Sequence, residues 1–281
     1  FIFRFSLGET DYQLGATDYE RFAAEYAFFG RSVWQQTLNL TDEEKTELIR
    51  LLQENYRPEN RVYRYNFFYD NCATRPRDKI EESIAGKVIY PAEPQDGSLT
   101  FRDIVHQYCK GHPWARFGID LCIGSEADQP ITQRQMMFAP FYLMDAFDGA
   151  QIKGDSIQRP LITANELIVD ATPEPDESDW MPTPLQCSLL LFILTAAATI
   201  YGIRRRTGLW GIDLFLFGIA GIVGCVLAFL ALFSQHPAVS SNFLLLVFHP
   251  GQLLFLPYII YCVRKGKKCW YLTLNLSLIH I

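Results

Sequence analysis

The chain has 281 residues, of which 49% are hydrophobic, and a formal net charge of −6. Residues 1–183 carry 18 basic and 30 acidic side chains, whereas residues 184–281 carry seven basic and one acidic. The acidic first part has no basic stripe, which argues against a nucleic acid as partner. The seven cysteines lack the spacing of a zinc site, and we predict neither a metal nor another cofactor. The sequence leaves open whether Cys109 and Cys122 form a disulfide.

The first part predicts an α+β domain, which we place at residues 1–152. Two capping-box patterns, Thr17-x-x-Glu20 and Thr41-x-x-Glu44, each predict the start of a helix. Alternating apolar residues predict strands over residues 32–40 and 62–69, and the second strand is rich in aromatic residues. Further helices are predicted around Pro76, from Thr100 and over residues 132–147.

Cys72 follows the aromatic strand where a helix is predicted to begin. Pro76 suits the first turn of a helix, because the N–H that it lacks would have no partner there. A thiol at a helix N-terminus lies near unpaired N–H groups and the positive end of the helix dipole, and both favour the thiolate. Arg75 and Arg77 add positive charge nearby. We therefore predict that Cys72 is a nucleophile; the alternative is a buried structural thiol.

A nucleophilic cysteine needs a base, usually a histidine held by a third polar group. The first part has only His106 and His112. We interpret the former as a satisfied surface or core histidine and the latter as a helix-stop residue. The chain begins at Phe1 without a methionine or a visible signal peptide and ends at Ile281 within an apolar stretch, so we interpret it as a fragment. We expect the catalytic histidine to lie before Phe1.

Three residues beside Cys72 are candidates for a supporting role. Asn71, Arg75 and Arg77 are predicted to bind a phosphate or an oxyanion, or to orient the thiol. The alternative for the two arginines is ion pairing with the acidic residues of the following helix, which are Asp78, Glu81 and Glu82.

The second part predicts a membrane domain. Residues 153–184 mix Pro, Asp and Glu and form a predicted tether. Apolar spans follow, each complete one near the ~20 residues that cross a bilayer; we place them at about 185–203, 209–233 and 243–263, with a partial span at 270–281. The basic clusters at 204–206 and 264–268 face the cytoplasm under the positive-inside rule. The first part then lies on the outer side of the membrane.

Two histidines of the second part are candidate lipid-side residues. His249 interrupts the third span together with Pro250 and Gly251, and an ionisable residue within a span indicates a functional site. His236 lies in the short outer loop near Asn242, where we expect it to help bind a lipid headgroup.

Several blocks of the first part resemble one family. Residues 57–61 read Arg-Pro-Glu-Asn-Arg, and residues 65–78 contain Asn-Cys-x-x-Arg-Pro-Arg, with Cys72 as their cysteine. Both blocks resemble the outer domain of the Bacteroides-type lipoprotein N-acyltransferases, as do residues 100–103 and 117–121. In that family a circularly permuted papain-like (NlpC-type) cysteine domain precedes a multi-span membrane domain. Permuted members carry the histidine before the cysteine, in a Phe-Gly-His-type motif, and this chain begins after that point.

The resemblance implies an α+β, permuted papain-like domain in the periplasm, followed by an α-helical transmembrane domain, multi-pass in the bacterial inner membrane. It implies an acyltransferase of lipoprotein maturation. The Cys72 thiolate takes an acyl chain from a phospholipid as a thioester, and the N-terminal amine of a lipoprotein accepts it. Two rivals stay open: a membrane-bound cysteine peptidase or amidase acting on cell-wall peptides, and a non-enzymatic outer-face binding module with a structural Cys72.

Overall fold

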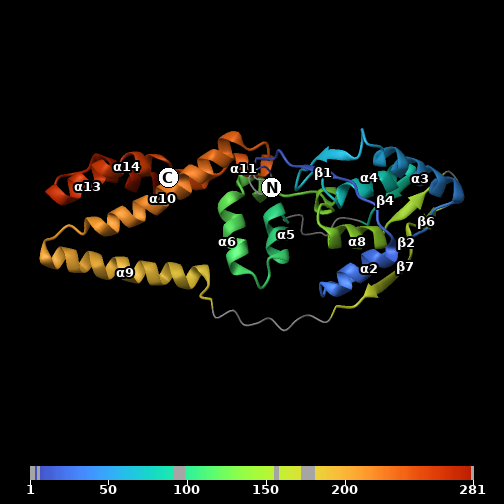
Figure 1. Cartoon of the computed structure of the whole chain (residues 1–281), viewed down its shortest axis with the longest axis horizontal. Coiled ribbons are helices and arrows are strands. Elements are labelled where there is room, and N and C mark those ends of the chain that lie inside the picture. The colour runs from blue at the N-terminus through green and yellow to red at the C-terminus, as the bar shows by residue number, and fades with distance from the viewer. Residues whose placement is uncertain (1–3, 5–6, 92–98, 155–157, 172–180, 280–281) are drawn as a thin grey trace. The chain divides into compact units, whose positions relative to one another are not determined.

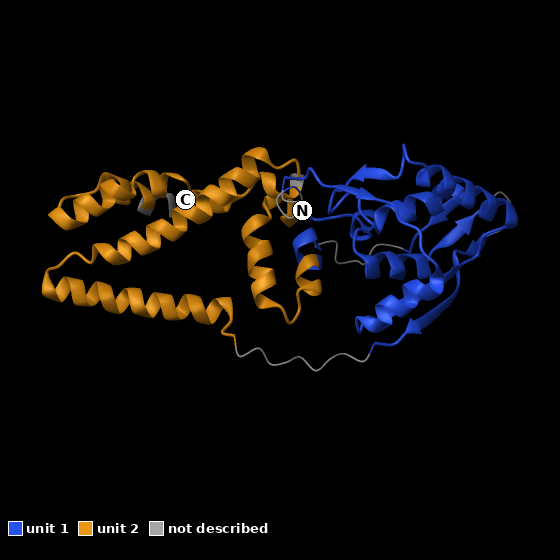
Figure 2. Cartoon of the chain, in the orientation of Figure 1, with its two compact units in different colours: residues 1–104, 130–180 blue, residues 105–129, 181–281 orange. Residues whose placement is uncertain are grey.

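The computed structural model describes residue 4 and residues 7–91, 99–154, 158–171 and 181–279. It divides into two compact units (Figure 2): unit 1 comprises Phe1–Ile104 and Pro130–Trp180, and unit 2 comprises Val105–Gln129 and Met181–Ile281. The division differs from the predicted boundaries, because residues 105–129 group with the membrane helices. Residues 158–169, placed in the predicted tether, belong to unit 1 as strands.

Unit 1 mixes helices with short antiparallel strands (Figure 1). Its described strands form three small sheets, with the orders β1-β3, β2-β7 and β4-β5-β6. The strands are β1 (Asp11–Gln13), β2 (Val33–Leu38), β3 (Val62–Arg64), β4 (Lys87–Ile89), β5 (Gln151–Lys153), β6 (Gln158–Pro160) and β7 (Ile162–Val169). The helices are α2 (Tyr19–Phe28), α3 (Asp42–Tyr56), α4 (Thr74–Ser83), α7 (Gln133–Met136), α8 (Pro140–Asp148) and the start of α5 (Phe101–Tyr108).

The strand predicted over residues 62–69 ends at Arg64. Asn66 and Asp70 pair through two backbone hydrogen bonds of 2.9 and 3.0 Å and turn the chain back on itself. The turn places Phe68, 2% exposed, in the core, where its ring stacks on Phe101 at 4.1 Å. Burial of this aromatic side chain favours the turn over a continued strand.

Of the two predicted capping boxes, one is confirmed and one is wrong. Thr41 and Glu44 exchange both hydrogen bonds of a capping box at the start of α3. In contrast, α2 begins at Tyr19 after Asp18, which makes no side-chain capping bond. The confirmed site has further support: Glu44 is 3% exposed and also bonds Ala85 and Arg159.

Glu44 is a buried carboxylate with several donors. It accepts hydrogen bonds from the backbone N–H groups of Thr41 and Ala85, and it pairs with the guanidinium of Arg159. Burial alone would raise the pKa of Glu44, but these donors outweigh burial and hold the pKa below its ordinary value of 4.5. The carboxylate therefore joins α3 to the segments that carry Ala85 and Arg159.

We expect Glu44→Gln to destabilise unit 1 by about 2 kcal/mol at neutral pH, because it leaves the half-buried guanidinium of Arg159 without its carboxylate. A lowered native pKa means that the contribution of Glu44 is complete above the unfolded value near 4.5 and is lost as the pH falls through the native value. Urea unfolding from pH 7 to pH 3 should show a smaller acid-induced loss in the variant. Glu47→Gln on the same helix, at an exposed pair with Arg50, is the control and should change little. Equal behaviour of the two variants would contradict this role of Glu44.

Unit 2 is helical. Its elements are α6 (Pro113–Cys122), η1 (Ser125–Asp128), α9 (Pro184–Arg205), α10 (Trp210–Phe233), α11 (Pro237–Ser240), η2 (Phe243–Leu246), α12 (Gly251–Leu254), α13 (Leu256–Lys265) and α14 (Trp270–Ile279). Among the described residues, α9 and α10 are each long and apolar enough to cross a membrane. The third predicted span is a pair of helical segments bent by 74°, with the break between Leu254 and Leu256.

Residues 105–129 join unit 2 through specific hydrogen bonds. Asn242 Nδ2 donates to the carbonyl of Leu121 at 2.7 Å, and the indole N–H of Trp114 donates to the carbonyl of Pro182 at 2.9 Å. The N–H of Gly124 also donates to the carbonyl of Ala238 at 2.6 Å. These bonds connect the segment to the start of α9 and to the loop that follows α10.

Two glycines of α10 let the broken span approach closely. A Cβ atom added to Gly224 would lie 2.5–2.6 Å from backbone atoms of His249, and one on Gly221 would lie 2.7 Å from the backbone nitrogen of Leu253. Small residues at such contacts allow helix backbones to pack without an intervening side chain.

We expect Gly224→Ala to destabilise unit 2 by about 1–3 kcal/mol, because the clash is with backbone, which cannot rotate away. Gly218→Ala is the matched control, since a Cβ there meets nothing within 4 Å and alanine favours a helix. Thermal unfolding of both variants in nanodiscs measures the difference. A melting temperature of Gly224→Ala equal to that of Gly218→Ala would show that the close approach is dispensable.

Candidate functional site

Cys72 lies in an exposed turn immediately before α4. The helix begins at Thr74, so the thiol stands two residues before the first helical residue, and Pro76 falls in the first turn as predicted. Because Cys72 is exposed, it does not match the alternative interpretation as a buried structural thiol. An exposed cysteine at this place is open to a reaction partner.

Asn71 holds the turn that carries Cys72. Its side-chain oxygen accepts hydrogen bonds from the N–H groups of Ala73 (2.8 Å) and Thr74 (3.0 Å). Its side-chain NH₂ donates to the carbonyls of Phe67 and Phe138, each at 2.9 Å. Asn71 is 3% exposed, and these four bonds use its two amide hydrogens and both lone pairs of its oxygen. Asn71 therefore has no donor left for a phosphate or an oxyanion, and of its two predicted roles only the orienting one fits.

Arg75 and Arg77 are both engaged by carboxylates of the chain. Arg75 makes a bidentate pair with Asp70, at 2.6 and 2.7 Å, and its guanidinium lies 3.5 Å from the centroid of the Tyr63 ring. Arg77 is 6% exposed and bonds Asp78 at 2.8 Å. Arg77 thus forms the predicted ion pair with an acidic residue of the following helix. Arg75 pairs instead with Asp70, which precedes the helix. The role of either arginine toward a phosphate stays a prediction.

Two tyrosines near Cys72 were missed by the sequence analysis. Burial is the main cause that raises the pKa of Tyr63 and of Tyr65, and negative charge on Cys72 raises both further. Tyr12 of the paired strand β1 stacks on Tyr65, with ring centroids 4.2 Å apart. Both tyrosines therefore lie close enough to Cys72 for its charge to act on them. The signal in the sequence is their i, i+2 spacing, which places both on one face of an extended segment.

No histidine belongs to the unit that holds Cys72, because residues 1–104 and 130–180 contain none. His106 belongs to unit 2, where its Nε2 lies 2.7 Å from Oδ1 of Asp120. His112 does not end a helix: it precedes α6 as its N-cap, without a side-chain capping bond. The position of the catalytic base before Phe1 stays a prediction.

The remaining candidate residues lie in unit 2. His249 Nε2 is 3.2 Å from Oδ1 of Asn275 in α14, and its ring packs edge-on to Tyr271, so a role toward lipid stays a prediction. His236 precedes α11, at the end of the loop after α10, and its role stays a prediction too. Cys109 and Cys122 are free thiols, and burial raises the pKa of Cys122. Among the described residues, no group of three or more His, Cys, Asp or Glu side chains is arranged to hold a metal ion.

Comparison with known families yields two matches. A family model described as the Lnb N-terminal periplasmic domain matches residues 1–106. A second, described as the Lnb transmembrane domain, matches residues 176–281. No curated protein and no solved structure matches the chain. The order of the two domains agrees with the predicted α+β domain followed by a helical transmembrane domain.

Proposed function

Because the chain belongs to the Lnb family and is a membrane protein with a periplasmic domain, we propose that it is a cysteine acyltransferase that moves an acyl chain from a phospholipid to the N-terminal amine of a lipoprotein. The observation that carries this proposal is the exposed Cys72, held by the buried Asn71 in a periplasmic domain that is joined to membrane spans. Donor and acceptor both reside in the membrane, which explains why such an enzyme is anchored there.

The first step forms a thioester on Cys72. Its thiolate attacks the carbonyl carbon of a phospholipid ester; the C–S bond forms, the C–O bond breaks, and the lysophospholipid oxygen takes a proton. In the second step the lipoprotein amine attacks the thioester; the C–N bond forms, the C–S bond breaks, and the amine loses a proton to a base. The thiolate is restored, which completes a ping-pong cycle. Asn71 acts as a positioning residue, because its side chain holds the turn that carries the sulfur.

The proposal is tested by looking for the intermediate. The full-length protein is incubated with phospholipid of one acyl composition and no lipoprotein, and its intact mass is measured. We expect an added fatty-acyl mass that hydroxylamine removes and that is missing in Cys72→Ala. Absence of the adduct from the wild type, with the lipid and the detergent varied, would count against acyl transfer.

A further inference from the structure

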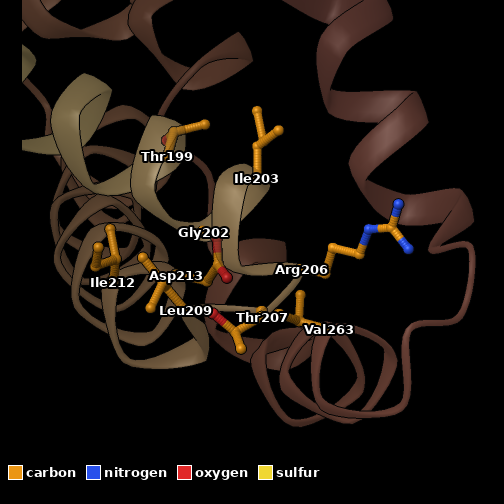
Figure 3. A pocket seen from close by; sticks show the side chains of 10 residues that line it. Thr199, Gly202, Ile203, Arg206, Thr207, Leu209, Ile212, Asp213 and Val263 are labelled. Carbon is orange, nitrogen blue, oxygen red and sulfur yellow. The ribbon is translucent and has the colours of Figure 1, made fainter.

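A cavity of about 360 Å³ opens between the membrane helices of unit 2 (Figure 3). Its walls come from the end of α9, the loop to α10, the first turn of α10 and the end of α13. The polar residues of the lining are Thr199, Arg206, Thr207 and Asp213. All of these belong to unit 2, and none is part of the site at Cys72.

Two glycines in the lining shape the cavity. After α9, the chain reverses at Arg206, which has a φ of 52°, and the N–H of Thr207 donates to the carbonyl of Gly202 at 3.0 Å. A Cβ atom on Gly202 would lie 3.0 Å from the oxygen of Thr207. One on Gly208 would lie 2.9 Å from Cγ1 and from the carbonyl oxygen of Val263. The close approach of the loop to α9 and α13 therefore depends on the absence of side chains at both positions.

Asp213 is the chemically informative residue of the lining. It is the only acidic residue of residues 184–281, and it stands in the first turn of α10, a span of high hydropathy. Asp213 is half-buried and makes no hydrogen bond or ion pair with any described residue. Because Asp213 stands at the end of the span, its charge is tolerated there, and a carboxylate that lines a cavity is suited to bind a cationic ligand.

Positively charged residues near Asp213 complement an anionic group elsewhere on the same ligand. Arg206 also lines the cavity, and its guanidinium points away from Asp213 in Figure 3. The two side chains therefore do not form an ion pair with each other. Arg264 and Lys265 follow the lining residue Val263 at the end of α13. The cavity lies where spans end, which is the depth of lipid headgroups.

We propose that this cavity binds the headgroup of an aminophospholipid, with its primary ammonium on Asp213 and its phosphate toward Arg206. A primary ammonium donates up to three hydrogen bonds, and a charge-assisted bond to a carboxylate is about twice as strong as a neutral one. A choline headgroup has no N–H to donate, and a glycerol headgroup has no positive charge. The site therefore selects ethanolamine over both. This binding does not depend on the chemistry of Cys72.

The test is lipid retention by the full-length protein. The protein is placed in nanodiscs that contain equal parts of phosphatidylethanolamine, phosphatidylcholine and phosphatidylglycerol, and the lipids that stay bound on release are counted by native mass spectrometry. The wild type should retain phosphatidylethanolamine in preference. Asp213→Asn should weaken its retention about tenfold and leave phosphatidylcholine unchanged. Arg206→Gln should weaken retention of all three lipids.

Arg205→Gln is the matched control, because it removes a charge from the same cluster but its guanidinium lies 5.9 Å from the Tyr201 ring and outside the cavity lining. It should bind as the wild type does. Wild-type protein that holds phosphatidylcholine as tightly as phosphatidylethanolamine overturns the proposal, whatever the variants do. The proposal is also overturned if Asp213→Asn has the melting temperature of the wild type and still retains phosphatidylethanolamine in preference.

Discussion

Replacing Cys72 with serine is expected to lower acyl transfer to a lipoprotein amine by about a thousandfold or more. A serine hydroxyl is a far weaker nucleophile than a thiolate at neutral pH. Because Cys72 is exposed, the substitution opens no cavity, and the melting temperature should not change. Transfer is measured with a synthetic diacylated lipopeptide by mass spectrometry.

Cys109→Ser is the control for loss of a free thiol, since Cys109 is also unpaired but belongs to unit 2. It should retain transfer. Wild-type transfer rates in Cys72→Ser would show that Cys72 is not the nucleophile, and no transfer by the wild type or the variant would favour the binding module. Cleavage of a soluble cell-wall peptide without phospholipid, lost in the same variant, would favour the peptidase or amidase.

Asn71→Ala is expected to destabilise unit 1 by about 3 kcal/mol and to reduce transfer as well. The change removes four hydrogen bonds and leaves the carbonyl of Phe138 and the N–H groups of Ala73 and Thr74 without the partner that they have now. The transfer rate should fall further than the loss of folded protein accounts for, because the turn that presents Cys72 loses its anchor. Urea unfolding and hydrogen exchange of the α4 amides measure the two effects.

Asn66→Ala is the matched control for this prediction. Asn66 supports the preceding turn, but it is only half-buried, and its side-chain oxygen accepts two longer bonds, from Phe68 (3.2 Å) and Tyr69 (3.3 Å). We expect a cost of about 1 kcal/mol and little change in transfer. If Asn71→Ala were no more harmful than Asn66→Ala, Asn71 would not be the residue that positions the thiol.

Much of the domain layout was predictable because it rests on local composition. Spans α9 and α10 follow from continuous apolar runs, and α3 begins at Thr41 because the capping box needs only residues three apart. Hydropathy did not predict the bend in the third segment, because it measures the length of an apolar run and not the direction of the helix axis. The break between Leu254 and Leu256 lies just before Pro257, which stands in the first turn of α13.

The candidate site was likewise predictable only in part. Residue type and local spacing singled out Cys72 at the start of a helix, and proximity along the chain singled out Asn71 and the two arginines. Their roles required the tertiary structure: Asn71 bonds Phe138, 67 residues later, and Tyr12 reaches Tyr65 only through the pairing of β1 with β3. Arg77 is buried by the fold and its charge is already paired, which no spacing rule reveals.

The sequence by itself determined that an acidic α+β domain precedes apolar spans and that one cysteine stands at the start of a helix. These features depend on short-range chemistry: hydropathy, caps and backbone preference. Only the tertiary structure decided that residues 105–129 belong with the membrane helices, through bonds such as that of Asn242 to Leu121, and that Asp213 faces a cavity. Both depend on contacts between segments far apart in the chain, and a pattern along the chain does not specify which distant segments will meet.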